Sequence, residues 1–317
     1  MSSMIMVENL VFDYPGHRVL DGLSFTVPQG SISALVGVNG VGKTTLLRCL
    51  AGLSMPHAGE VHINGFNTQD ASRQVHEQIG YLSDFFGLYD DLTVAQCLEV
   101  TMLTRPTVHD DVAAAIRQVA GRVQLEDHLN KKAQQLSRGL RQRLGIAQAI
   151  VHQPKLLILD EPASGLDPLA RSELATLLLA LQEEGMTLLV SSHILTELEA
   201  YSTHMLHLRD AETIYFTEVS AEALQGAPTL VITPLEASPR LLPFLESMPH
   251  VSAVSPQEGG RDITFQFHGD EAARAALLTQ VVGQGHAISA LYERKQDFQT
   301  LFLQQIPKGE GLERVAS

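Results

Sequence analysis

One stretch of the chain is suited to bind phosphate groups, and it reads Gly37-Val38-Asn39-Gly40-Val41-Gly42-Lys43-Thr44-Thr45. An apolar run at 34–36 predicts a buried strand before it, and apolar residues at helical spacing follow it, at Leu46, Leu47, Leu50 and Leu53. Glycines between a strand and a helix let backbone N–H groups and the helix N-terminus point at one anion. Lys43 can then reach the β- and γ-phosphates of a nucleoside triphosphate, and the Thr44 hydroxyl can coordinate Mg²⁺. We favour this interpretation over an ordinary glycine-rich turn because strand, loop and helix all fall where the motif needs them.

Two acids follow a second apolar run. Residues 156–159 are aliphatic and Asp160 and Glu161 come next, as at the carboxyl end of a strand buried on both faces. In a chain with a phosphate loop, Asp160 is predicted to hold Mg²⁺ and Glu161 to act as general base on the attacking water. His193 ends a further apolar run, which favours contact with the γ-phosphate over a structural role.

Three other positions are candidates. Ser137 is placed like the N-cap of a new helix, and Asp167 lies in a tight loop just beyond the two acids. Tyr14 lies in an expected exposed turn at 12–16, where it can stack on an adenine or simply cover the edge of the core. His204 and His207 have no acid or cysteine that completes a metal site, so we interpret them as structural.

Composition limits the class of protein. The chain has 317 residues, which suggests two domains, and a formal net charge of −14, which argues against a nucleic-acid partner. Its two cysteines, Cys49 and Cys97, are too few for a disulfide framework and fit a reducing, cytosolic setting. There is no signal-peptide pattern and no apolar run of about 18 residues, so another chain is expected to supply any membrane-spanning part.

Strand and helix patterns predict an α/β domain at 1–224 with a helical insertion at about 93–150. Short strands are expected at 5–12, 23–27, 59–63 and 79–82, with a hairpin-type turn at Asn64-Gly65. A linker is expected at 225–228. The order of elements over 229–306 is βαββαβ with a closing helix at 297–306, which predicts a small ferredoxin-like α+β domain for docking, dimerisation or regulation. The tail at 307–317 is expected to be disordered.

Five segments together resemble the nucleotide-binding subunits of ABC transporters. They are the Walker A loop 37–45, the signature motif 136–143, the Walker B strand 156–161 with its glutamate, the D-loop 164–167 and the switch histidine His193. Their order and spacing agree with that family over about residues 4–220. The resemblance implies a P-loop ABC-ATPase domain, with Tyr14 stacked on the adenine of ATP.

The resemblance also implies partners. Each ATP is capped by Ser137 and Gly139 of a second subunit, and Asp167 is a D-loop residue at the same site. Hydrolysis releases this dimer, a homodimer by expectation, on the cytoplasmic face of the membrane beside an integral-membrane permease. The C-terminal domain and the signature variant are similar to the ABC-2-type exporters.

The chain departs from the family pattern at two places. The signature reads Leu136-Ser137-Arg138-Gly139-Leu140, where the family has Leu-Ser-Gly-Gly-Gln. The glutamine expected in the Q-loop is Asp84, which can contact the Mg²⁺ shell but has a shorter reach.

Two alternative functions remain open from the sequence. A soluble ABC ATPase of translation or DNA repair is disfavoured by the single cassette, the absence of sustained heptads and the acidic balance. A catalytically inactive ATP-binding protein is disfavoured by the presence of both Glu161 and His193.

Overall fold

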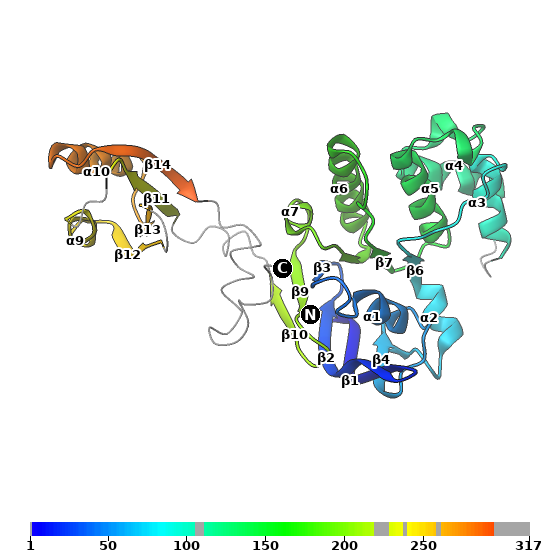
Figure 1. Cartoon of the computed structure of the whole chain (residues 1–317). Helices are drawn as coiled ribbons and strands as arrows, with labels where there is room; N and C mark the ends of the chain where they lie inside the picture. The colour runs from blue at the N-terminus through cyan, green and yellow to red at the C-terminus, as the bar shows by residue number, and fades with distance from the viewer. Residues whose placement is uncertain (1, 105–110, 219–227, 237–239, 258–260, 295–317) are drawn as a thin grey trace. The chain divides into compact units, whose positions relative to one another are not determined.

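The structure is a computed structural model that describes residues 2–104, 111–218, 228–236, 240–257 and 261–294. The chain divides into two compact units, Met1–Val219 and Ser220–Ser317, and Figure 1 shows the elements of each. Most of the expected linker at 225–228 lies outside the described residues, as do the expected helix at 297–306 and the tail at 307–317.

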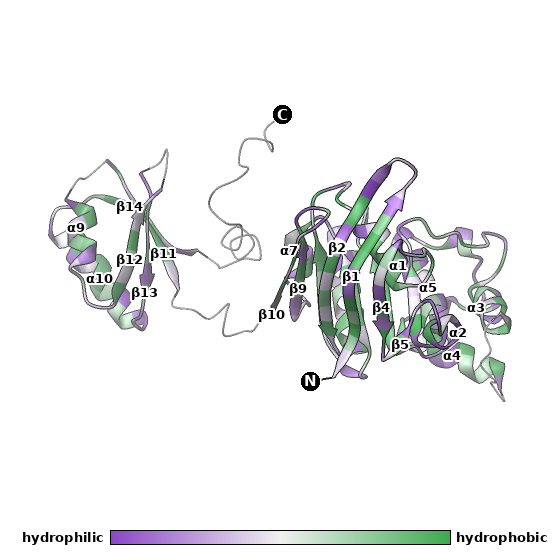
Figure 2. Ribbon diagram, turned by 90° about the horizontal axis from the view of Figure 1, so that it is seen from below, coloured by the Kyte–Doolittle hydropathy of each residue, from purple (hydrophilic) through white to green (hydrophobic). Residues whose placement is uncertain are grey.

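An antiparallel sheet begins the first unit. Its order is β2 (His17–Pro28), β1 (Ser3–Tyr14), β4 (Ala58–Ile63) and β5 (Phe66–Asn67). Buried and exposed residues alternate along β1 and β2, and Figure 2 shows the matching alternation of hydropathy. Asn64 and Gly65, both at positive φ, form the predicted turn between β4 and β5.

The first two strands are longer than the sequence pattern predicts. Tyr14 is the last residue of β1, so the expected turn at 12–16 is wrong in extent, and only Pro15 and Gly16 separate β1 from β2. Gly16 has a φ of 79°, which allows the chain to reverse within two residues.

A second sheet carries the residues with predicted chemistry. Its order is β10 (Ile214–Glu218), β9 (His204–Leu208), β3 (Ile32–Val36), β8 (Thr187–Ser191), β7 (Leu156–Asp160) and β6 (Ile79–Leu82). All neighbouring strands are parallel except β10, and every residue of β3, β7 and β8 is buried. The carboxyl ends of parallel strands meet at one edge, so the segments after β3, β7 and β8 lie close together.

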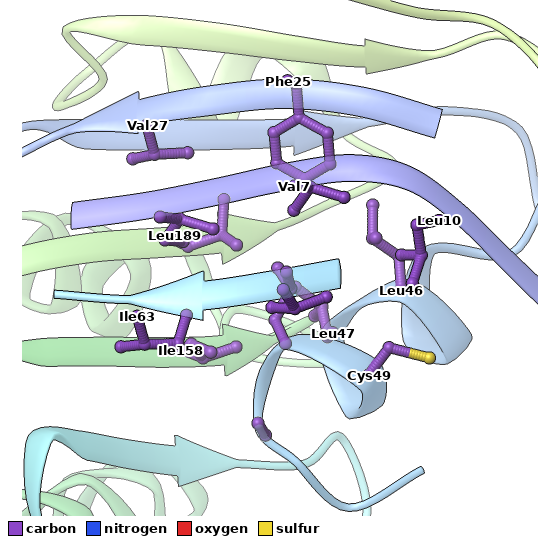
Figure 3. Close-up of a cluster of buried hydrophobic side chains, with 14 of the residues drawn as sticks. Val7, Leu10, Phe25, Val27, Leu46, Leu47, Cys49, Ile63, Ile158 and Leu189 are labelled. Carbon is purple, nitrogen blue, oxygen red and sulfur yellow. The ribbon is translucent and has the colours of Figure 1, made fainter. Parts of the chain in front are cut away.

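A hydrophobic cluster joins the two sheets and helix α1 (Lys43–Leu50). Figure 3 shows side chains from β1 and β2, from α1 and from β7 and β8 in this one cluster. Helix α1 ends earlier than predicted, because Gly52 at a φ of 68° allows Leu53 N to donate to Arg48 O at 2.9 Å, as in a Schellman cap. Leu53 is therefore 51% exposed, and its predicted place in the apolar stripe is wrong.

The expected helical insertion is present. It contains α3 (Val94–Leu103), α4 (Val112–Arg122) and α5 (Arg138–Ile150), which Figure 1 shows grouped apart from β1 and β2; residues 105–110 lie outside the description. Short 3₁₀ turns at Glu126–His128 and Ala133–Gln135 join α4 to α5. The other helices in the described part of this unit are α2 (Ser72–Gln78), α6 (Pro168–Glu183) and α7 (Leu195–Leu198).

The second unit has the predicted βαββαβ order. Its elements are β11 (Thr229–Pro234), α9 (Leu241–Glu246), β12 (Val251–Pro256), β13 (Ile263–Phe267), α10 (Glu271–Gly283) and β14 (Ile288–Arg294). The antiparallel sheet order is β12-β13-β11-β14, the order of a ferredoxin-like sheet, and Phe265, Leu277 and Val281 belong to its core. Within the described parts of the whole chain, no helix is both long enough and apolar enough to cross a membrane.

Candidate functional site

The loop between β3 and α1 needs its glycines for steric reasons. A Cβ on Gly37 would lie 2.6 Å from Leu208 O, and one on Gly42 would lie 2.9 Å from Val19 Cγ1. Gly40 and Gly42 also have φ values of 81° and 114°. The last of these glycines, Gly42, is the N-cap of α1. The first N–H groups of a helix lack partners within the helix and favour an anion, so the loop and the start of α1 together suit phosphate.

Lys43 is buried and points back at this loop. Its Nζ donates to Gly37 O at 2.8 Å and lies 3.9 Å from Glu161 Oε1. Burial lowers the pKa of Lys43, and the charges of Glu161 and Asp160 oppose that shift. The ammonium group is thus held at the loop for which the sequence predicts phosphate binding.

Asp160 joins the loop to the sheet. Thr44 Oγ1 donates to Asp160 Oδ2 at 2.7 Å, and Ser191 Oγ donates to Asp160 Oδ1 at 2.6 Å. Hydroxyl and carboxylate oxygens are the donors that Mg²⁺ prefers, so Thr44 and Asp160 fit the predicted cation. Among the described residues, no cluster of three or more histidines, cysteines or acids could hold a metal ion. The predicted Mg²⁺ site therefore depends on Thr44 and Asp160.

Glu161 has an unusual backbone conformation and a short contact. Its φ is 49°, a left-handed value that costs a non-glycine residue about 1 kcal/mol or more. Its Oε2 accepts a hydrogen bond from His193 Nδ1 at 2.8 Å. Because its other oxygen faces Lys43, the carboxylate lies between the cation of the loop and the histidine at the end of β8.

A cavity of about 420 Å³ adjoins the loop. Its lining contains Tyr14, Asn39, Lys43, Thr44 and Glu161. Gly40, Gly42 and Thr45 also line it. Tyr14 is 45% exposed and meets Phe12 in a T-shaped arrangement with ring centroids 5.0 Å apart, so stacking on an adenine stays a prediction. Of the other predicted loop residues, Val38 is 66% exposed and Val41 packs against the core.

Ser137, Gly139 and Asp167 lie in a different cavity of about 340 Å³. Ser137 caps α5 by accepting from Leu140 N at 3.3 Å, and Asp167 caps α6 by accepting from Ala170 N at 2.9 Å. The structure therefore brings these three predicted residues together with one another but not with Lys43 and Thr44.

Asp84 lines a third cavity of about 260 Å³, together with Glu161 and Arg138. Burial and the charges of Asp160 and Glu161 raise the pKa of Asp84, whereas Arg138 and His193 oppose the shift. Asp84 does not line the cavity that contains Thr44, so its contact with a metal shell stays a prediction.

Ser191 belongs to the site and was not singled out from the sequence. Its Oγ accepts from Glu161 N at 2.9 Å while it donates to Asp160. The signal that could have found it is its position: it ends a buried strand next to β7, two residues before His193.

An ion pair beside the His193 loop was missed as well. Glu197 Oε1 lies 3.2 Å from Arg171 Nε, and Glu197 Oε2 accepts from Ser192 Oγ at 3.2 Å. Ser192 Oγ in turn accepts from Ile194 N at 3.0 Å. Glu197 thus connects helix α6 to both residues that flank His193.

Residues interpreted as structural from the sequence occupy structural positions. Cys49 and Cys97 are buried, and burial raises the pKa of the Cys49 thiol to about 12. His204 contacts Thr203 Oγ1 at 2.9 Å and stacks on Phe216, and His207 is buried beside Tyr215.

Comparisons with known proteins place the chain in a family. A family model described as "ABC transporter" matches residues 20–164. The uncharacterized ABC transporter ATP-binding protein YxlF of Bacillus subtilis is 30% identical over 307 residues, 96% of this chain and 99% of that protein. The bacitracin transport ATP-binding protein BcrA of Bacillus licheniformis is 36% identical over 206 residues, 65% of this chain and just under two thirds (66%) of that protein.

A solved structure described as "Dimeric Structure of MJ0796, a Bacterial ABC Transporter Cassette" aligns with a TM-score of 0.61 at 25% identity, over 69% of this chain and 100% of that one. The chain belongs to the family of ABC transporter ATP-binding proteins, and it is an ATP-hydrolysing subunit of that class.

Proposed function

We propose that this subunit uses ATP hydrolysis to drive export through a separate membrane permease. The observation that carries the proposal is the position of Glu161, whose two carboxylate oxygens face Lys43 Nζ at 3.9 Å and His193 Nδ1 at 2.8 Å. A carboxylate between the phosphate-binding cation and a histidine is suited to take a proton from water that attacks the γ-phosphate.

Binding of ATP falls to the glycine loop and its helix. The N–H groups at the start of α1 and the Lys43 ammonium bind the phosphates, and Tyr14 stacks on the adenine. Thr44 and Asp160 hold Mg²⁺, which neutralises charge on the phosphates when it is bound. Ser191 keeps the Asp160 carboxylate in place for that task.

Glu161 and His193 carry out the hydrolysis step. Glu161 accepts the proton of the water, and His193 orients the Glu161 carboxylate and contacts the γ-phosphate. Most of the rate gain in this class of reaction comes from positioning and charge neutralisation, so the fixed geometry of the two residues matters more than their basicity.

A second subunit completes each site. Ser137 and Gly139 begin helix α5 in a cavity without Lys43, which supports a role on the ATP of a partner. Asp167 lines the same cavity and belongs to this interface. The related cassette whose description names it dimeric supports two copies of this chain as the assembly.

Membership of the family supports a permease partner and a location at the membrane. BcrA is named as a bacitracin transport protein, which supports transport over translation or DNA repair. We assign the chain to the cytoplasmic face of the membrane, and the net charge of −14 disfavours a nucleic-acid partner. The match to YxlF extends over nearly the whole chain, so the C-terminal unit is part of this transporter type and a candidate for docking or dimerisation.

The test is capture of the partner from native membranes. Tagged Glu161→Gln protein, with ATP and Mg²⁺, is incubated with detergent-solubilised membranes, and bound proteins are identified by mass spectrometry. Lys43→Ala protein is the matched control, since it should not close on ATP. Recovery of one polytopic membrane protein with Glu161→Gln supports the proposal, whereas recovery of ribosomal or DNA-repair proteins without a membrane protein contradicts it.

A further inference from the structure

The loop after Glu161 folds into one compact turn with that residue. Ser164 N donates to Glu161 O at 3.1 Å, and Leu166 N donates to Ala163 O at 3.2 Å. Because Ser164 N is bonded to Glu161 O, the position of this turn is tied to the backbone that carries the Glu161 side chain.

Arg138 holds this turn from the side of helix α5. Its Nη2 donates to Ser164 O at 3.0 Å. Its guanidinium lies against Gly165 so closely that a Cβ there would be 2.3 Å from Arg138 Cζ. A planar group on a glycine surface, with a hydrogen bond to the preceding carbonyl, is a contact that lysine cannot reproduce.

The same arginine lies in the segment that reaches the partner. Arg138 is the first residue of α5, between Ser137 and Gly139, which the proposed function assigns to the ATP of a second subunit. In this assignment Ser137 and Gly139 face the nucleotide of the partner subunit. Arg138, which lies between them, holds the turn that follows Glu161 in its own subunit.

Charge in this region also depends on Arg138. The lining of the cavity of about 260 Å³ includes the acids Asp84 and Glu161 and the arginines Arg138 and Arg141. Arg141 is paired with Asp90 at 2.7 Å, whereas Arg138 donates to a neutral carbonyl and keeps its charge available to the two acids. Both Asp84 and Arg138 stand where the family pattern expected from the sequence has another residue.

We propose that Arg138 is a positioning residue that couples the signature end of α5 to Glu161 of the same subunit, and that its charge compensates for Asp84. This inference depends on the proposed function for the roles of Glu161, Ser137 and Gly139. The contact between Arg138 and the turn at 164–165 exists independently of that function.

The kinetic test is a double-mutant cycle with four proteins: unmodified chain, Arg138→Ala, Asp84→Gln and the combination. ATP turnover gives kcat, and equilibrium binding of a fluorescent ATP analogue gives affinity. We expect Arg138→Ala to lower kcat about tenfold and leave affinity within about twofold, since misplacing Glu161 affects the chemical step. Relative to its effect in the unmodified chain, whatever the size of that effect, Asp84→Gln should raise kcat at least about threefold in the Arg138→Ala background.

The matched control is Arg73→Ala, which removes an arginine whose side chain is 80% exposed on α2. Equal kcat for Arg138→Ala and this control overturns the inference. A loss of affinity for the ATP analogue in Arg138→Ala as large as its loss of kcat overturns it as well. An effect of Asp84→Gln that is the same in both backgrounds overturns the charge compensation.

A second readout does not need hydrolysis. Hydrogen exchange without nucleotide should become faster at the amides of Ser164 and Leu166 in Arg138→Ala and stay unchanged in Arg73→Ala. Unchanged exchange overturns the positioning contact. If the unmodified chain shows no ATP turnover but the difference in exchange is present, the proposed function is contradicted and the contact between Arg138 and the turn is still supported.

Discussion

Ser191 on β8 lies opposite Asp160 on the neighbouring parallel strand β7, and its hydroxyl donates to Asp160 Oδ1 at 2.6 Å. The Ser191 hydroxyl oxygen also accepts a hydrogen bond from Glu161 N at 2.9 Å. One small side chain therefore orients the carboxylate proposed to hold Mg²⁺ and fixes the backbone that presents the proposed general base. This arrangement explains how a left-handed φ at Glu161 is maintained next to a regular strand.

We expect Ser191→Ala to lower kcat for ATP about tenfold while ATP affinity changes less than about twofold, because positioning of the two acids is lost. The variant should also lose about 1–3 kcal/mol of unfolding free energy, since a buried amide and a carboxylate lose a partner. Steady-state turnover and urea denaturation measure the two effects. Ser172→Ala, an exposed serine of α6, is the control, and kcat equal to that control contradicts the assigned role.

Much of this site could be predicted from sequence because its polar residues come directly after apolar segments that form buried strands. The glycine loop, the two acids at the carboxyl end of β7 and the N-cap Ser137 lie where local pattern decides the structure. Ser191 and Arg138 could not be assigned in the same way. Their partners are 31 and 26 residues away, so only strand order and the packing of α5 reveal the contacts.

The same distinction applies to the fold. The βαββαβ order of the C-terminal unit was predicted correctly from alternating patterns. The pair β9 and β10 was not predicted as strands. Strand β9 contains two histidines, His204 and His207, and it is paired with β3 on one side and β10 on the other, which the local pattern does not reveal. The end of α1 was misplaced because the left-handed Gly52, rather than the apolar spacing, ends the helix.

Lys43→Ala should weaken ATP binding about 100-fold, because the phosphates lose a charge-assisted hydrogen-bond donor that the fold already holds in place. Isothermal titration calorimetry of ATP with Mg²⁺ measures the affinity. Lys155→Ala removes an exposed lysine outside the nucleotide cavity and should bind normally. Normal affinity in Lys43→Ala would contradict the assignment of the loop.

Glu197→Gln should lower kcat about fivefold in the unmodified chain and have no further effect in a His193→Ala background. The reason is that Glu197 contacts Ser192 at 3.2 Å and Arg171 at 3.2 Å, so it acts on the reaction through the loop that contains His193. Turnover of the two single variants and the double variant gives the result. Multiplicative effects of the two substitutions would show that Glu197 acts by another route.

His207 should make the protein less stable in acid. Burial, and secondarily Arg209, lowers the pKa of His207 from 6.5 to about 4, and Asp210 opposes the shift. Between these values the unfolded chain binds the proton more readily than the folded chain, so stability falls as pH falls from about 6.5 to about 4. The loss from this residue is at most about 3 kcal/mol.

Urea denaturation at several pH values checks this expectation. The dependence on pH should become shallower in His207→Gln and stay unchanged in His57→Gln, which replaces an exposed histidine. An identical slope for His207→Gln and the unmodified chain would exclude His207 as the source.

In the proposed cycle, two copies of this chain close on ATP, and hydrolysis at Glu161 opens the dimer. Size-exclusion chromatography with light scattering on Glu161→Gln, with and without ATP and Mg²⁺, tests it most directly. We predict twice the monomer mass with ATP, the monomer mass without it, and the monomer mass in both conditions for Glu161→Gln combined with Lys43→Ala. A monomer of Glu161→Gln at an ATP concentration that saturates binding would contradict the account.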